Sequence, residues 1–282
     1  MKLTEKEYWD EIYRLESNQY QSPSWKGRFK NLFKKLVRKK YFNYLENYSE
    51  YLIWEVIYRK YLPAIKSAKV LEVGSAPGEH LIKLKQRFDF IPYGVEYSKI
   101  GFELNRQMFL LNDINPDNVI YADFLAEEFQ ARNQEYFDIV ISRGFIEHFS
   151  EVENIIEKHN KILKKGGYLV ITIPNLRGVN YLLSEFFNKG SGSIHNLNIM
   201  SKGRFQKLFK QDQWEHLFCN YYGTFNFNLF NAKSGSPMRL ILFCCKIIQL
   251  ILNIIFRLLF NGRGFENKRF SPYLIFIGRK KG

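Results

Sequence analysis

The stretch that decides the fold is VLEVGSAPGEHLIKL, residues 70–84. An apolar run with one acid ends at residue 73, a turn of small residues follows, and the segment after Gly78 has the pattern of a helix start. Small residues allow backbone N–H groups to approach a ligand closely, and a helix N-terminus adds positive potential. The stretch therefore predicts the strand, loop and helix of a nucleotide-type site in an α/β fold.

Strand and helix patterns alternate after residue 69, which is typical of a parallel sheet. We expect strands at 70–73, 91–96, 118–122, 137–142 and 168–173, a sixth within 217–230, and a seventh at 272–278. A helix should join the fourth and fifth strands, because Ser150 and Glu153 have the spacing of a capping box.

Acidic residues stand at the ends of three successive strands. Glu72 and Glu96 end the first and second, and Asp123 follows the third. Ligands of such sheets bind beyond the carboxyl ends of the strands, so the three carboxylates should surround one site. Glu96 can accept two hydrogen bonds from a ribose diol, which an NAD site would also require. Asp123 can accept from an adenine amine, cap the following helix, or do both.

The glycine loop distinguishes between two cofactors. A dinucleotide fingerprint would fall on Gly74, Ala76 and Glu79, and the carboxylate of Glu79 would repel a pyrophosphate. The loop instead resembles the first motif of class I S-adenosylmethionine (SAM) methyltransferases, an acid-x-Gly-x-Gly-x-Gly run. Glu72, Gly74, Ala76 and Gly78 fill that run here, with Ala replacing the middle Gly. SAM carries no phosphate, so Glu79 is compatible with it.

Two further stretches extend the resemblance over residues 69–175. FDIVISRGFIEHF, 137–149, is similar to the fourth-strand region of these methyltransferases, and LKKGGYLVITIPN, 163–175, to their fifth-strand turn and its Pro-Asn end. The resemblance implies an α/β, Rossmann-like, seven-stranded, mostly parallel sheet with helices on both faces. It places a final antiparallel strand between the fifth and sixth. It also implies SAM as cofactor and transfer of its methyl group.

The resemblance further implies a set of cofactor-binding residues. Glu72 would hold the methionine amino end, and Glu96 would bind the ribose hydroxyls with Tyr97 near the adenine. The glycine loop, the adenine-recognising pair and one residue near the sulfonium complete the set: Gly74, Ser75, Ala76, Gly78, Asp123, Phe124 and Ser142.

Three residues are candidates for the chemistry. His148 could be the general base for an alcohol or phenol, because imidazole titrates near neutrality, or it could only orient its loop. His195 lies in the insertion 175–200, expected to act as a lid, and could be a second base, a substrate contact or a surface residue. Arg143 would stand near the sulfonium, which disfavours a cation, and so could turn outward toward an anionic substrate.

Composition limits the partners. The formal net charge of +14 favours an anionic partner such as nucleic acid, a membrane surface or an acidic glycan. Cys219, Cys244 and Cys245 show neither metal-ligand spacing nor a disulfide framework, so we expect no metal site and a reducing compartment. Residues 1–5 carry an acid and no apolar run, so we expect no secretory signal and a cytoplasmic protein.

Residues 1–62 are expected to form an N-terminal helical cap. It would contain a helix at 4–16, a basic amphipathic helix at 25–40 and an aromatic-rich helix at 41–61. The basic helix is typical of a membrane-surface element, or of a solvated face. Residues 63–282 would form the methyltransferase domain, with the lid at 175–200 and an apolar helical insertion at 231–270.

Residues 238–260 within that insertion are almost entirely apolar. Their polar residues form one narrow stripe at helical spacing: Arg239, Lys246, Gln249, Asn253 and Arg257. Such a helix could lie in a membrane interface with its cations at the headgroups, or pack in a dimer or across the domain. Spanning is disfavoured, because the last strand must return to the sheet.

These observations favour a SAM-dependent methyltransferase at the cytoplasmic membrane face. The membrane contacts would be 25–40 and 238–260, and the enzyme would O-methylate a lipid-linked glycan, a lipid or a quinone-like molecule. Alternatives are an RNA methyltransferase, which would explain the charge, and a non-catalytic SAM-binding or scaffold protein. Nucleic acid is disfavoured, because Ser142 and Arg143 stand where ribose 2′-O-methyltransferases need an Asp.

Overall fold

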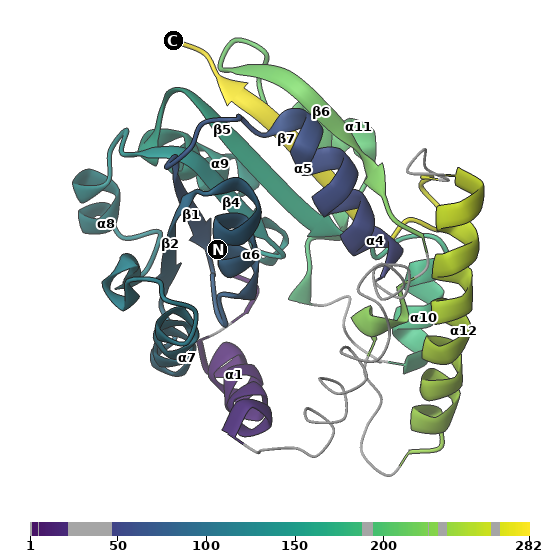
Figure 1. Cartoon of the computed structure of the whole chain (residues 1–282). Helices are drawn as coiled ribbons and strands as arrows, with labels where there is room; N and C mark the ends of the chain where they lie inside the picture. The colour runs from purple at the N-terminus through teal and green to yellow at the C-terminus, as the bar shows by residue number, and fades with distance from the viewer. Residues whose placement is uncertain are drawn as a thin grey trace.

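The computed structural model describes residues 2–4, 6–21, 47–187, 194–224, 226–230, 236–260 and 266–282. The basic helix predicted at 25–40 lies outside them. The described strands form one seven-stranded sheet in the order β3-β2-β1-β4-β5-β7-β6 (Figure 1). Their bounds are β1 Lys69–Val73, β2 Ile91–Glu96, β3 Val119–Tyr121, β4 Phe137–Arg143, β5 Leu163–Pro174, β6 Trp214–Tyr222 and β7 Tyr273–Lys280.

The sheet topology confirms the predicted fold. Strands β1 to β5 pair in parallel, and β7 lies antiparallel between β5 and β6. Two predicted boundaries were wrong. Strand β6 starts at Trp214, three residues before the predicted window. The turn expected at 164–167 lies inside β5, where the register with β4 shifts and Gly166 adopts a φ of 74°.

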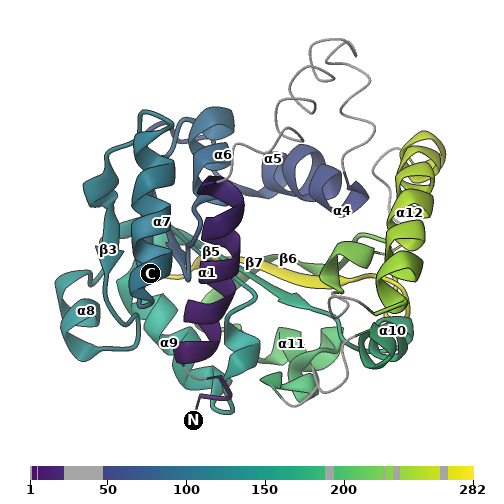
Figure 2. The ribbon, with the colours of Figure 1, turned by 90° about the horizontal axis from the view of Figure 1, so that it is seen from below.

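Helices cover both faces of the sheet (Figure 2). One face carries α4 Tyr48–Tyr51, a π-helix at Leu52–Ile57, α5 Tyr58–Tyr61, α6 Glu79–Phe88 and α7 Lys99–Leu110. The other carries α8 Glu127–Arg132, α9 Val152–Ile162 and α11 Lys202–Lys207. Side chains alternate along β1: Val70 packs in the core beneath α4–α7, and Leu71 and Val73 pack in the core beneath α8, α9 and α11.

Helix α1, Lys6–Gln21, packs on α7 and covers the carboxyl ends of the strands (Figure 2). A Cβ atom at Gly101 of α7 would lie 2.8 Å from the Tyr13 ring, so only glycine allows this close approach.

The cap predicted at Ser150 was wrong: Glu151 directly precedes α9 and makes no side-chain capping bond.

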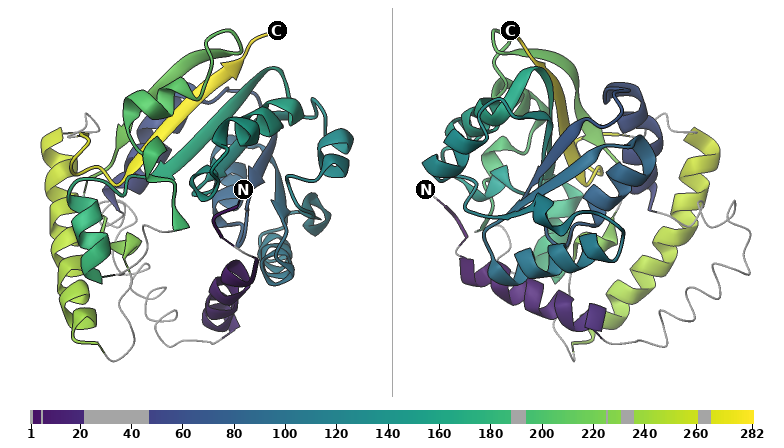
Figure 3. Two further views of the ribbon diagram at one scale, coloured as in Figure 1. Left: turned by 180° about the vertical axis from the view of Figure 1, so that it is seen from behind. Right: turned by 60° about the vertical axis from the view of Figure 1, so that its left-hand side comes forward.

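The apolar insertion forms α12, Met238–Phe260, at the edge of the molecule beside α10, Val179–Phe187 (Figures 1 and 3). Three residues of its polar stripe, Gln249, Asn253 and Arg257, face the protein, whereas Arg239 is exposed. Gln249 Oε1 accepts from the Phe227 N–H at 2.6 Å, and Asn253 Oδ1 accepts from the Tyr48 N–H at 3.2 Å. The expectation that the stripe's cations reach headgroups was therefore wrong for Arg257, which is buried. These polar groups serve backbone donors that would otherwise lack partners.

Candidate active site

A cavity of about 230 Å³ opens at the carboxyl ends of β1, β2 and β4, beneath α1. It is the place where ligands bind in open α/β sheets. Seven residues of the predicted cofactor and catalytic sets line it together with His148: Gly74, Ala76, Glu96, Tyr97, Asp123, Phe124 and Arg143. The lining does not include the other predicted residues, which are Glu72, Ser75, Gly78, Ser142 and His195.

The loop after β1 is held in a conformation that suits glycine. Gly74 and Gly78 have φ values of +67° and +95°. The Gly74 N–H donates to Val95 O at 3.0 Å, which ties the loop to β2. Ser75 Oγ accepts from Asn105 Nδ2 at 2.6 Å, which ties it to α7. Ser75 and Gly78 therefore shape the loop from behind, while Gly74 and Ala76 face the cavity.

Glu96 ends β2 and is only 2% exposed. Its Oε1 accepts from the Ser98 N–H at 2.9 Å, and its Oε2 accepts from the Tyr13 hydroxyl at 3.3 Å. Burial raises the pKa of this carboxyl, and the hydrogen bonds only partly offset that effect. Tyr13 was missed as a site residue. Tyr13 follows Trp9 by four residues on α1, and both line the cavity. Their helical spacing places them on one face of the helix, and this pattern could have indicated Tyr13 from the sequence.

At the predicted adenine side, Asp123 already has two partners. Its Oδ1 accepts from the Leu125 N–H at 2.9 Å, and its Oδ2 accepts from Lys2 Nζ at 3.0 Å. The same Lys2 Nζ lies 5.1 Å from the centre of the Tyr97 ring. The first residues of the chain, which were not among the predicted site residues, thus reach the cavity. Phe124 is buried beside it and offers an apolar surface.

Glu72 belongs to a buried polar group behind the loop. Its Oε1 lies 3.2 Å from His80 Nδ1, and the Tyr58 hydroxyl lies 3.1 Å from His80 Nε2. Burial lowers the pKa of His80. Arg143 is partly exposed at the cavity, and its Nη2 lies 3.8 Å from Glu50 Oε1, so the protein itself supplies a nearby counter-charge.

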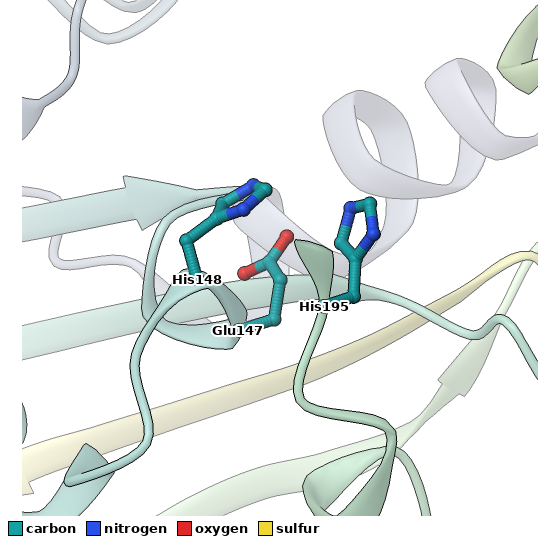
Figure 4. Close-up of side chains that lie close together, drawn as sticks. All are labelled: Glu147, His148 and His195. Carbon is teal, nitrogen blue, oxygen red and sulfur yellow. The ribbon is translucent and has the colours of Figure 1, made fainter. Parts of the chain in front are cut away.

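His148 and His195 were predicted separately, and the fold brings them together. Their ring centres lie 4.7 Å apart, and both side chains point toward Glu147 (Figure 4). His148 Nδ1 lies 3.0 Å from Ile194 O, so Nδ1 carries the proton that it donates and Nε2 keeps its lone pair. Burial, and then the charge of His195, lower the pKa of His148 to about 4. With this pKa the His148 ring is neutral at pH 7 and can accept a proton, but it is a weak base. The catalytic roles of both histidines stay predictions.

The residues present fit SAM. Glu96 offers a carboxylate for a diol, Phe124 and Val95 offer apolar surface, and the loop's glycine conformations let backbone approach a ligand. The cavity, the loop and the strand-end acid together define a nucleoside-binding domain of the methyltransferase type. When bound, SAM supplies an activated methyl group.

The comparisons identify the family. Residues 44–234, more than half of the chain, match a family described as a methyltransferase domain. The chain therefore belongs to the class I SAM-dependent methyltransferases, as its sequence motifs indicated. No curated protein matches the sequence.

Solved structures share the fold at low identity. Phosphoethanolamine N-methyltransferase 2 of Haemonchus contortus, in complex with SAM, is 13% identical with a TM-score of 0.51, and the match covers 81% of this chain and 52% of that one. Geranyl diphosphate C-methyltransferase of Streptomyces coelicolor A3(2) is 11% identical with a TM-score of 0.51, covering 82% and 78%. Its structure holds Mg²⁺, geranyl diphosphate and S-adenosylhomocysteine. The [4+2]-cyclase SpnF is 12% identical with a TM-score of 0.51, covering 81% and 80%. The acceptor therefore has to be argued from this chain's own surfaces.

Proposed function

We propose that this methyltransferase O-methylates a lipid, a lipid-linked glycan or a quinone-like molecule while bound peripherally to the cytoplasmic face of a membrane. The observation that carries the proposal is α12. Leu240, Phe243, Leu258 and Leu259 expose 59% to 70% of their surface, while the polar Gln249, Asn253 and Arg257 are buried.

An apolar outer face is unfavourable in water. Each buried square ångström of apolar surface is worth about 25 cal/mol, so a helix in water normally turns that surface inward. A large apolar patch at a surface marks an interface with a membrane or a protein. Among the described residues, α12 alone is long and apolar enough to cross a membrane, with a mean hydropathy of 2.1 over its most apolar window. This inverted arrangement supports contact with acyl chains.

The connections of α12 favour lying on the membrane rather than spanning it. The Phe227 N–H, in the short helix before α12, donates to Gln249 Oε1 on α12 itself. After α12 the chain returns to β7, which lies between β5 and β6 in the sheet. Both flanks therefore belong to one folded domain, and an interfacial helix keeps them on the same side.

Charge and thiols support the same location. The net charge of +14 would attract an anionic leaflet, where each basic residue near the surface contributes about 1 kcal/mol. Cys219, Cys244 and Cys245 are free thiols, which suits a reducing compartment.

The chemistry expected of the site is alignment in a water-poor cavity. The loop after β1 and Glu96 would orient the cofactor, and α1 would exclude water above it. A hydroxyl acceptor must also lose its proton. His148 is the titratable side chain at the cavity wall whose Nε2 is available to accept a hydrogen bond from such a hydroxyl.

Flotation with vesicles of phosphatidylglycerol and phosphatidylethanolamine tests the membrane location. The variant Phe243→Glu/Ile247→Glu/Ile251→Glu places three charges on exposed positions of α12 at helical spacing. At high salt we expect the parent to float and this variant to stay at the bottom of the gradient. The control, Leu110→Glu/Leu111→Glu, alters two exposed leucines at the end of α7 and should float like the parent.

A parent that stays at the bottom at both low and high salt would contradict the membrane proposal, and flotation of the α12 variant equal to that of the parent at high salt would contradict attachment through α12. Binding of RNA that weakens steeply with salt, without vesicle binding, would instead favour the RNA methyltransferase. Calorimetric titration with S-adenosylhomocysteine is the separate test of the cofactor site. No heat from a folded parent would favour a scaffold role whatever the vesicles show.

A further inference from the structure

We propose that Glu147, His148 and His195 form a binding site for a divalent transition-metal ion, with Zn²⁺ as the best fit, at the acceptor side of the cofactor cavity. Each residue offers one ligand atom, a carboxylate oxygen or an imidazole nitrogen. These three atoms all lie within 4.8 Å of one another (Figure 4).

The geometry is close to that of a bound ion. Zinc bonds of about 2.0–2.2 Å to oxygen or nitrogen limit two ligands of one ion to about 4.2 Å apart. The three ligand atoms, which lie within 4.8 Å of one another, would have to move only slightly closer together to bind one ion. The ligand types favour Zn²⁺ over Mg²⁺ and Ca²⁺. Two imidazoles and one carboxylate suit Zn²⁺, whereas Mg²⁺ and Ca²⁺ prefer oxygen ligands alone.

Glu147 is the second observation that points to a ligand. Its side chain is only 1% exposed, and its Oε2 has no hydrogen-bond partner among the described residues. Buried carboxylate oxygens normally have partners, and burying one without compensation is costly. Figure 4 shows this carboxylate between the two histidine rings. A cation there would supply the missing partner.

The surrounding structure holds the ligands in place. His148 Nδ1 donates to Ile194 O, which leaves Nε2 as the ligand atom and fixes the ring in the way typical of metal-bound histidines. Two bonds from Asn196 join the two segments: its N–H donates to Glu147 O at 2.7 Å and its Nδ2 donates to Phe149 O at 3.1 Å. The segment carrying His195 is thereby fixed against the short helix Ile146–His148.

The position relates the ion to the reaction. His148 also lines the cofactor cavity, so an ion on its Nε2 would stand at the cavity wall with a coordination position left for an acceptor, and binding to the ion would replace the direct hydrogen bond from the acceptor hydroxyl to Nε2. The ion can bind an acceptor hydroxyl and lower its pKa, so that the proton is lost to water. Methyl transfer then forms an O–C bond and breaks the S–C bond, whose electron pair stays on sulfur and neutralises its charge. This role rests on the proposed function, whereas metal binding does not.

The test is titration of the full chain, freed of metal by a chelator, with Zn²⁺ by calorimetry and with Co²⁺ by visible absorption. We expect one ion per chain. Glu147→Gln and His195→Asn should each weaken binding by more than about tenfold, an effect already seen when a residue that only hydrogen-bonds to a metal ligand is changed. Matched controls are Glu151→Gln, an exposed acid nearby, and His216→Asn on β6. Both should bind like the parent.

Titration with S-adenosylhomocysteine and thermal melting accompany each variant. Retained cofactor binding in Glu147→Gln would show that its loss of metal is not misfolding. Two results would overturn the proposal: no saturable binding of either ion by the folded parent, or equal binding by the cluster variants and the controls. A parent that binds metal but no S-adenosylhomocysteine would keep the site and remove the methyltransferase role.

Discussion

Glu96 combines an unfavourable effect on folding with the chemistry expected of a residue that binds a ribose. It sits at the wall of the cavity with almost no exposure, and burial raises its pKa. Its charged form is therefore less stable in the folded chain than in the unfolded chain. This destabilisation is present at neutral pH and disappears below the ordinary glutamate pKa of about 4.3. A ribose diol would provide the hydrogen bonds that compensate for the charge.

We predict that Glu96→Gln weakens S-adenosylhomocysteine binding by at least about tenfold, or about 1.4 kcal/mol, because an amide accepts diol hydrogen bonds at only one atom. The unliganded variant should melt no lower than the parent at pH 7, and this relative advantage should vanish as pH falls toward 4. Calorimetry and thermal melting measure the two effects. Glu103→Gln, on the exposed side of α7, is the control and should change neither.

Gly78 is constrained by its backbone and by its neighbours. It has a φ of +95°, and a Cβ there would lie 2.2 Å from Asn105 Oδ1. Gly203, on α11, has nothing within 4 Å of the same atom. We predict that Gly78→Ala loses about 1–3 kcal/mol of unfolding free energy, whereas Gly203→Ala gains about 0.5–1 kcal/mol from helix propensity. Urea unfolding measures the free energy of unfolding of both variants and of the parent. Equal effects would show that the loop tolerates a side chain.

At the scale of the element, α12 depends on polar residues that face inward. Asn253 Oδ1 accepts from the buried Tyr48 N–H, and replacing Asn253 by an apolar residue removes this acceptor. We predict that Asn253→Leu costs about 1–3 kcal/mol, the penalty for an unsatisfied buried donor. Ile251→Leu, on the exposed face, should be neutral. Urea unfolding measures the free energy of unfolding of both variants. An unchanged value for Asn253→Leu would mean that α12 docks through apolar contacts alone.

Most of the sheet could be predicted from the sequence, because strand patterns, the glycine loop and the strand-end acids are local signals. The inward direction of the stripe on α12 could not, because spacing gives a face but not what it packs against. The contact between His148 and His195 could not be predicted either, since Ile194, which His148 contacts, lies 46 positions further along the chain. Glu147 was overlooked because its burial, rather than its identity, makes it unusual.

At the scale of the whole molecule, two forces would hold the protein on a membrane, and they respond differently to salt. The net charge of +14 acts through the anionic leaflet, and screening shortens its reach from about 10 Å at 0.1 M salt to about 3 Å at 1 M. The apolar face of α12 acts through burial, which salt does not weaken.

We therefore predict that raising salt reduces but does not abolish flotation of the parent on anionic vesicles. The variant Phe243→Glu/Ile247→Glu/Ile251→Glu, which keeps most of the positive charge, should bind weakly at low salt and not at all at high salt. Flotation across a salt series measures both. If the parent is released completely at high salt, charge alone holds it, and α12 must face a protein partner instead. Retention of the parent, together with loss of the variant, assigns the lasting attachment to α12.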